Sequence, residues 1–229
     1  MKKFILLFTV LAGLISCTEK NPKSVWISVK NKALTSTKLG YEVHEYSFIL
    51  DFEKHESHFL TYNADSILKF DINSKLDTLI FQEKENTEKY RLKFYKNDSL
   101  EVYLKEINTT KVFIPLNLDY KLNYSRKQII YSLLEKTYAI NDTFSMRFSS
   151  NKYPSYYKDE KTLIAYHPNR KIKGSWQIGE KNKNFFLILR DFPDQYIFQI
   201  TSLDTTKINL KNIYPKDLQT NMSELRVIK

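Results

Sequence analysis

The chain has 229 residues, a formal net charge of +10, 14% aromatic residues, four glycines and one cysteine. The aromatic content supports packed cores and excludes a disordered polyelectrolyte, and the length allows one large domain or two small ones. A single cysteine excludes an intrachain disulfide framework and a cysteine-rich zinc site. Neither G-x-G-x-x-G nor G-x-x-x-x-G-K-[ST] occurs, which excludes the Rossmann and P-loop classes.

Residues 1–16 have the pattern of an export signal. Two lysines precede an apolar run over 4–14, which is short for a membrane span of about 20 apolar residues. The run ends in Leu14-Ile15-Ser16-Cys17, which resembles a bacterial lipobox. This resemblance implies cleavage before Cys17 and attachment of diacylglyceryl and palmitate groups to that residue. The alternatives are a plain signal peptide with an incidental cysteine, or a weak membrane anchor.

Residues 17–24 are interpreted as a lipid anchor and tether. The polar segment 18–24 reaches at most about 25 Å when extended, which keeps the folded part near the membrane. Thr18 stands where an aspartate would favour inner-membrane retention by analogy with enterobacterial sorting. The composition, rich in Lys and Asn, resembles that of Bacteroidota proteins. We therefore expect an outer-membrane lipoprotein that faces the periplasm, with the membrane as its partner through the acylated cysteine.

Alternation of apolar and polar residues predicts strands after residue 24. Each predicted strand has one apolar face for a core and one polar face for solvent. Because glycines are few, the turns must use Asn, Asp and Lys, as at 96–99 and 181–184. The apolar members of the first four alternating runs are Tyr46, Phe48, Leu50 and Phe52, then Leu68, Phe70 and Ile72, then Tyr90, Leu92 and Phe94, then Leu100, Val102 and Leu104.

The second half of the chain repeats the pattern of the first at an offset of 106 residues. Phe70 falls on Trp176, Tyr90 on Tyr196 and Asp98 on Asp204. We interpret this as a duplication, with one β-domain over 25–120 and a second over 125–229. The alternative is one continuous β-structure whose hairpins look alike.

A short helix is predicted over 125–134, between the two halves. Ser125 and Gln128 have the spacing of a capping box. The apolar residues that follow share one helical face, namely Ile129, Ile130, Leu133 and Leu134. The helix is expected to open the second domain and cover a barrel end; the alternative is a packed linker helix.

The pattern of the chain resembles bacterial lipocalin-like lipoprotein domains, which often open with G-x-W. The first domain opens with Ser24-Val25-Trp26 and the second has Lys136-Thr137-Tyr138, while Gly174-Ser175-Trp176 lies in mid-domain. The resemblance implies an all-β fold of two tandem antiparallel barrels or sandwiches joined by a short helix. That family binds ligands with interior apolar side chains.

An eight-stranded barrel is either filled by side chains or holds one small ligand. Large aromatics favour a filled core in at least one half. The residues expected to point inward are Trp26, Phe48, Phe70, Phe81, Phe94, Trp176, Phe186 and Phe198. The candidates for contact with a ligand are Trp26, Phe48, Phe70, Trp176 and Phe198.

Two polar segments contain residue types that could carry chemistry. Glu53 and the segment 55–58, with His55 and His58, offer weak metal binding or, as we expect, a solvated hairpin tip. Asp191 and Asp194 flank Pro193, which is typical of a turn, and no activated nucleophile is nearby. We therefore expect no catalytic residues, no metal site and no cofactor.

The positive charge is scattered, and 167–173 is the one local basic segment. For an exported lipoprotein this predicts a solvated lysine-rich surface rather than a nucleic-acid site. The function expected is that of a non-enzymatic envelope protein that binds a small apolar ligand or an envelope partner. The alternative is an interaction or inhibitor lipoprotein that acts on a protein through loops or strand edges. A cavity above about 300 Å³ would favour a ligand, and filled barrels with an exposed apolar patch would favour a protein.

Overall fold

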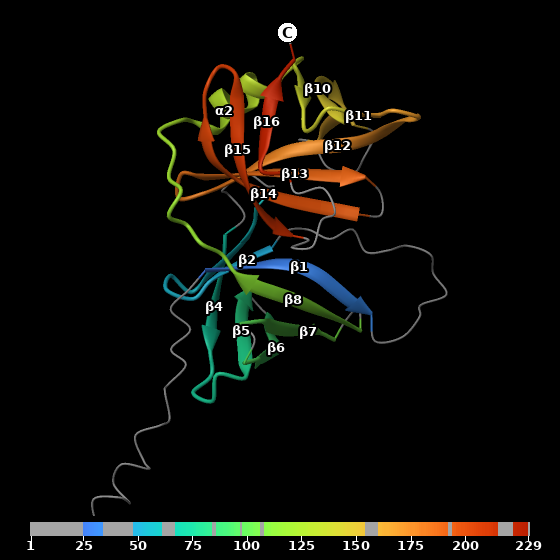
Figure 1. The fold of residues 1–229 in the computed structure, drawn as a ribbon. Coiled ribbons are helices and arrows are strands. Elements are labelled where there is room, and N and C mark those ends of the chain that lie inside the picture. The colour runs from blue at the N-terminus through green and yellow to red at the C-terminus, as the bar shows by residue number, and fades with distance from the viewer. Residues whose placement is uncertain are drawn as a thin grey trace, which may run out of the picture.

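Two closed antiparallel barrels follow one another in the computed structural model (Figure 1). The structure describes residues 25–33, 48–60, 67–83, 86–96, 98–105, 108–153, 160–191, 194–214 and 222–228. The first barrel consists of β1 (Val25–Ala33), β2 (Phe48–Asp51), β3 (Glu56–Phe59), β4 (Leu68–Ile72), β5 (Thr78–Glu83), β6 (Asn86–Phe94), β7 (Leu100–Leu104) and β8 (Thr109–Pro115). The predicted all-β class with two tandem barrels is confirmed.

The second barrel begins after the helix α2 (Arg126–Leu133). Its strands are β9 (Thr137–Ala139), β10 (Ser145–Lys152), β11 (Lys161–His167), β12 (Arg170–Lys181), β13 (Asn184–Asp191), β14 (Asp194–Leu203), β15 (Lys207–Tyr214) and β16 (Glu224–Val227). In both barrels neighbouring strands pair in chain order, and the first pairs with the last. The chain therefore needs only hairpin connections inside each barrel.

The predicted helix is present with its capping box. The Ser125 side chain accepts from the backbone N–H of Gln128, whose side chain in turn accepts from the backbone N–H of Ser125. Ile129 and Leu133 are fully buried in the core of the second barrel. The helix thus covers one end of that barrel (Figure 1).

Turns without glycine use left-handed residues, as the sequence predicted. Asn182 and Lys183 both have positive φ, 50° and 60°, in the two-residue turn between β12 and β13. Such a pair matches the twist of the flanking strands. Asp98, between β6 and β7, has φ of 53°.

The interior of the first barrel is a cluster of aromatic rings in contact. Trp26 packs edge-on against Phe94, Phe94 contacts Phe52, and Phe52 contacts Phe70, with ring centroids 5.5 to 6.0 Å apart. Phe81 continues the series from Phe70. Leu68, predicted to face inward, is instead 37% exposed. This prediction was wrong because the short pairing of β3 with β4 leaves Leu68 at the barrel end.

The outer faces of the two barrels pack against each other. The prediction of a solvated outer face is wrong here. Phe186 was expected inside the second barrel, but Phe185 points inward and Phe186 lies in the contact between the barrels. The cluster also contains Ile27, Val29, Ile49, Leu60, Leu116, Ile188, Ile197 and Ile213. Burial of these apolar side chains stabilises the two-barrel arrangement.

The segment between the barrels, residues 116–124, is held against the second barrel. The Asn184 side chain donates to the Leu118 carbonyl at 2.8 Å. The Gln199 side chain donates to the Asn117 carbonyl at 2.8 Å, and Leu116 is buried between the barrels. The connection is therefore part of the packed structure.

The offset of 106 residues matches the faces of the strands but not their register. Phe70 pairs with Phe81, whereas the residue equivalent to Phe70, Trp176, pairs with Leu189. The residue equivalent to Phe81 is Leu187, two positions away. An even shift keeps the same side chains inside, because strand side chains alternate with period two.

Candidate functional site

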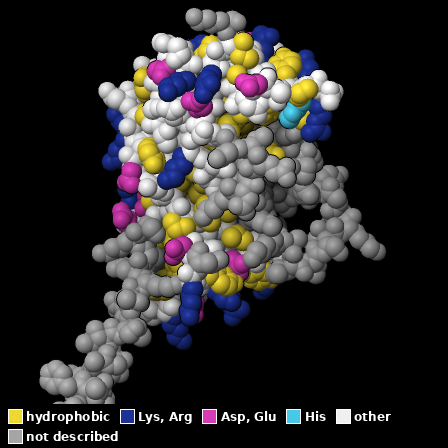
Figure 2. Space-filling model, viewed as in Figure 1, with side chains coloured by type: hydrophobic (Ala, Val, Ile, Leu, Met, Phe, Trp, Pro, Cys, Tyr) yellow, Lys and Arg dark blue, Asp and Glu magenta, His cyan; other side chains and the backbone are white. Residues whose placement is uncertain are grey.

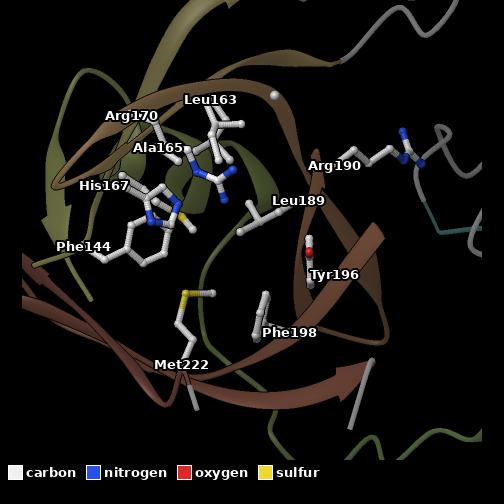
Figure 3. A pocket seen from close by; sticks show the side chains of 13 residues that line it. Phe144, Leu163, Ala165, His167, Arg170, Leu189, Arg190, Tyr196, Phe198 and Met222 are labelled. Atoms are coloured by element: carbon white, nitrogen blue, oxygen red, sulfur yellow. The ribbon is translucent and has the colours of Figure 1, made fainter. Parts of the chain in front are cut away.

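A cavity of about 190 Å³ lies inside the second barrel, at the end away from α2 (Figure 3). The helix contacts the later part of β12, where the Arg126 side chain donates to the Ile178 carbonyl at 2.6 Å. The cavity contacts the beginning of the same strand, at Arg170, Ile172 and Gly174. Its apolar walls include Met146, Leu163, Ala165, Leu189, Phe198 and Met222.

The rim of the cavity carries a ring pair and a cation. His167 ends β11 and Arg170 begins β12, and the two residues pair across the tight hairpin. The imidazole of His167 is stacked on the Phe144 ring, with centroids 4.3 Å apart and an interplanar angle of 20°. Figure 3 shows the Arg170 guanidinium beside this pair, over the apolar walls.

The second arginine at the cavity is turned away from it. Figure 3 shows the Arg190 side chain directed out of the barrel. There it forms an ion pair with the buried carboxylate of Glu160 and donates to the Gln195 side chain at 3.0 Å. No ion pair to a carboxylate in the described part of the chain is formed by Arg170, which leaves its charge available at the rim.

A second hollow adjoins the rim on the surface. This groove has a volume of about 350 Å³ and is lined mainly by polar residues of the loop 139–145 together with Tyr166 and Pro168. Phe144 and His167 line both hollows, so their stacked rings form the wall between cavity and groove.

Three of the five ligand candidates lie in the first barrel, away from the cavity. Trp26 and Phe70 are buried in its aromatic core, and Phe48 is partly buried beside Phe113. The indole N–H of Trp26 is buried without a hydrogen-bond acceptor among the described residues. This donor is the one polar feature of the three side chains.

The other two candidates lie in the second barrel. Phe198 lines the cavity. Trp176 is fully buried, packs edge-on against Phe148 and donates its indole N–H to the Ser149 carbonyl at 3.1 Å. Trp176 therefore has a structural contact and does not line the cavity, whereas Leu163 and Arg170 do.

The two histidines of the segment 55–58 have different surroundings. His55 is exposed on the turn, with φ of 54°, and stacks on Phe70. His58 lies in β3, half-buried, so its placement on a solvated tip was wrong. Burial, with the nearby Lys181 and Lys54, lowers the His58 pKa to about 4, against the opposite effect of Asp51. Among the described residues no group of three or more potential metal ligands occurs.

Several predicted features lie outside what the structure describes. Residues 1–24, with Cys17 and the tether, are among them, and so is Tyr46. Asp191 and Asp194 pair at the end of the β13–β14 hairpin, but their side chains are not described.

Figure 2 shows Lys and Arg side chains distributed over the face in view, with Asp and Glu among them.

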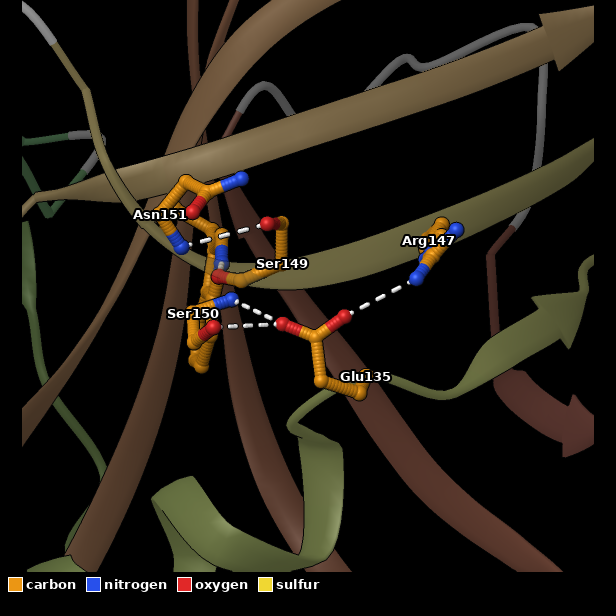
Figure 4. A network of polar contacts seen from close by, with 6 residues as sticks. Glu135, Arg147, Ser149, Ser150 and Asn151 are labelled. Carbon is orange, nitrogen blue, oxygen red and sulfur yellow. Dashed lines mark hydrogen bonds and ion pairs between the residues drawn. The ribbon is translucent and has the colours of Figure 1, made fainter.

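A polar network at Glu135 fixes the helix end to the second barrel (Figure 4). The Glu135 carboxylate accepts from the backbone N–H and hydroxyl of Ser150, both at 2.6 Å, and pairs with Arg147 at 2.9 Å. These hydrogen bonds from Ser150 and Arg147 lower the Glu135 pKa to about 2. The backbone of Glu135 has a φ of 58°, which is unfavourable for a residue with a side chain. The hydrogen bonds to Ser150 and the ion pair with Arg147 hold the residue in this conformation, so we assign the network a structural role.

Comparison of the chain with protein-family models, curated proteins and solved structures gave no significant match. None of the helices in the described residues has the length and apolar character needed to cross a membrane.

The sequence did not single out Arg170 as a ligand contact. Its segment, 167–173, is basic in sequence, but only the pairing of His167 with Arg170 at a hairpin end places Arg170 at the rim.

Proposed function

We propose that this chain is a non-enzymatic, lipid-anchored protein of a bacterial outer membrane that binds a small apolar ligand in its second barrel. The cavity is the observation that carries the binding proposal. Its walls are mainly apolar, and it lies at the barrel end that α2 does not cover. A cavity of about 150 Å³ with apolar walls holds benzene, so 190 Å³ suits a ligand of one ring or a short chain.

The small volume limits the ligand class. The cavity falls below the volume of about 300 Å³ that we set as the mark of a ligand-binding barrel, which is also where pockets for drug-sized ligands start. The aromatic contacts that fill the first barrel support a structural role for that half. Binding is therefore assigned to the second barrel and to a ligand smaller than a lipid.

Native mass spectrometry of the protein purified from its host membrane tests the binding proposal. We expect an added mass that is lost under denaturing conditions. The variant Ala165→Phe, which fills the cavity, should lack this mass while keeping the circular dichroism of the barrels. An added mass that persists in that variant would place the ligand elsewhere and overturn the proposal.

The anchor is supported by the lipobox-like segment that ends in Cys17. Dual or triple acylation would hold the protein on a membrane essentially permanently, since each buried CH₂ contributes about 0.8 kcal/mol. In Cys17→Ser, acyl groups and membrane association should both be lost, whereas Thr18→Ser should keep them. Acylation that survives in Cys17→Ser would disprove the anchor.

The alternative function, binding of a protein partner, is favoured by one observation. Tyr131, on the outer side of α2, is 60% exposed, and Tyr124 just before the helix is also exposed. Binding of a partner through a free strand edge is not supported, because the described strands form two closed barrels. A partner that co-purifies with the wild-type protein but not with Tyr131→Ala would support this function.

A further inference from the structure

The charge at the rim restricts the ligand beyond its size. Arg170 lines the cavity, and its backbone is fixed by the hairpin pairing with His167. Figure 3 shows its guanidinium beside the stacked Phe144 and His167 rings. Other arginines of this barrel have carboxylate partners, Arg147 with Glu135 and Arg190 with Glu160. A guanidinium without such a partner, beside an apolar chamber, suits the anionic head of an otherwise apolar molecule.

A carboxylate fits this rim best among small anions. The guanidinium presents parallel N–H groups that match the two oxygens of a carboxylate. The apolar walls at Leu163, Leu189 and Phe198 would surround the uncharged body. The stacked Phe144 and His167 rings line the cavity near Arg170, so a ring or chain in the cavity would have its polar end beside the guanidinium.

We propose that the second barrel binds a small monocarboxylate with one aromatic ring or a short aliphatic chain, its body in the cavity and its carboxylate on Arg170. This inference rests on the proposed binding function and adds the chemical class of the ligand. The cavity volume of about 190 Å³ favours a short apolar body over a long acyl chain.

Calorimetric titration of the soluble form of the protein, residues 18–229, tests the ligand class with matched probes. The probes are 3-phenylpropionate and 3-phenylpropan-1-ol, which share a ring and differ in the charged group. We expect the carboxylate to bind more tightly than the alcohol. Arg170→Gln should weaken carboxylate binding about 10- to 100-fold, the range for a hydrogen bond between charged groups, and leave alcohol binding unchanged.

Two control variants separate the possible outcomes. Lys173→Gln removes an exposed charge from the same strand and should bind both probes as the wild type does. Ala165→Phe should abolish binding of both. Equal affinity for the two probes, or no effect of Arg170→Gln, would overturn this inference but leave cavity binding intact. Failure of both probes to bind, or their binding to Ala165→Phe, would overturn the proposed function as well.

Discussion

Asp51 of the first barrel and Lys181 of the second form an ion pair of 2.9 Å, with side chains only 2% and 7% exposed. The pair lies at the contact between the barrels, next to the half-buried His58. Taking two charges out of water is costly, so the pair constrains which surfaces can meet rather than simply adding stability. Because Asp51 and Lys181 come from different barrels, any other packing of the two barrels would leave both charges buried without a partner.

Removal of one partner of this pair should destabilise the protein strongly. Lys181→Met leaves the Asp51 carboxylate buried without its counter-charge, which costs about 3–5 kcal/mol. The double variant Asp51→Leu with Lys181→Met should recover most of this loss. Urea denaturation measures both. Arg226→Met, which breaks the exposed pair with Glu224, serves as control and should cost at most about 1 kcal/mol.

Gly179 should not tolerate a side chain. A Cβ at this position would lie 2.4 Å from Leu60 Cγ and 2.8 Å from the Leu60 carbonyl oxygen. Gly179→Ala should therefore cost about 1–3 kcal/mol through overpacking between the barrels. In a double-mutant cycle with Leu60→Ala, the combined cost should be less than the sum, because the shortened side chain relieves part of the clash. Strict additivity would contradict this contact.

His58 should make stability fall in mild acid. Its pKa is about 4 in the folded protein, below the ordinary value of 6.5. As the pH falls from about 6.5 to 4, the unfolded chain takes up a proton that the folded protein does not, so the free energy of unfolding decreases. His58→Gln should flatten this decrease in denaturation curves recorded across that range. His55→Gln, on the exposed turn, is the matched control and should keep it.

The two tryptophans should respond differently to the same substitution. Trp176→Phe removes a buried hydrogen bond to Ser149, whereas Trp26→Phe removes an indole N–H that has no acceptor among the described residues. Both variants lose the same volume, so their difference isolates the polar group. Trp176→Phe should be the more destabilising by about 1–3 kcal/mol in urea denaturation. Equal losses would show that Trp26 also has a partner.

The barrels were predictable because their strands are half-buried. Alternation in runs such as 90–94 marks which side chains face a core, and the even register shift between the barrels keeps the same side chains inside. The capping box at Ser125 and Gln128 predicted the start of α2 equally well. Both patterns depend only on residues close together in the sequence, so they can be recognised without knowledge of the whole fold.

The contact between the barrels was not predicted, although β13 carried a signal for it. Its segment 185–189 reads Phe-Phe-Leu-Ile-Leu, an unbroken apolar run rather than an alternating one. A run of this kind indicates a strand buried on both faces. The site was harder to predict, because the place of Arg170 at the rim depends on the barrel end that α2 leaves open and on the hairpin register.

The hydrogen bonds of the connecting segment determine where the chain can be divided. A cut after residue 120, at the boundary suggested by the sequence, would remove Leu116 and the carbonyls of Asn117 and Leu118 from the second barrel. The buried side chains of Asn184 and Gln199 would lose those acceptors, and Phe186 would face water. A separately expressed second barrel should therefore start before Leu116 and would still need its exposed apolar wall replaced.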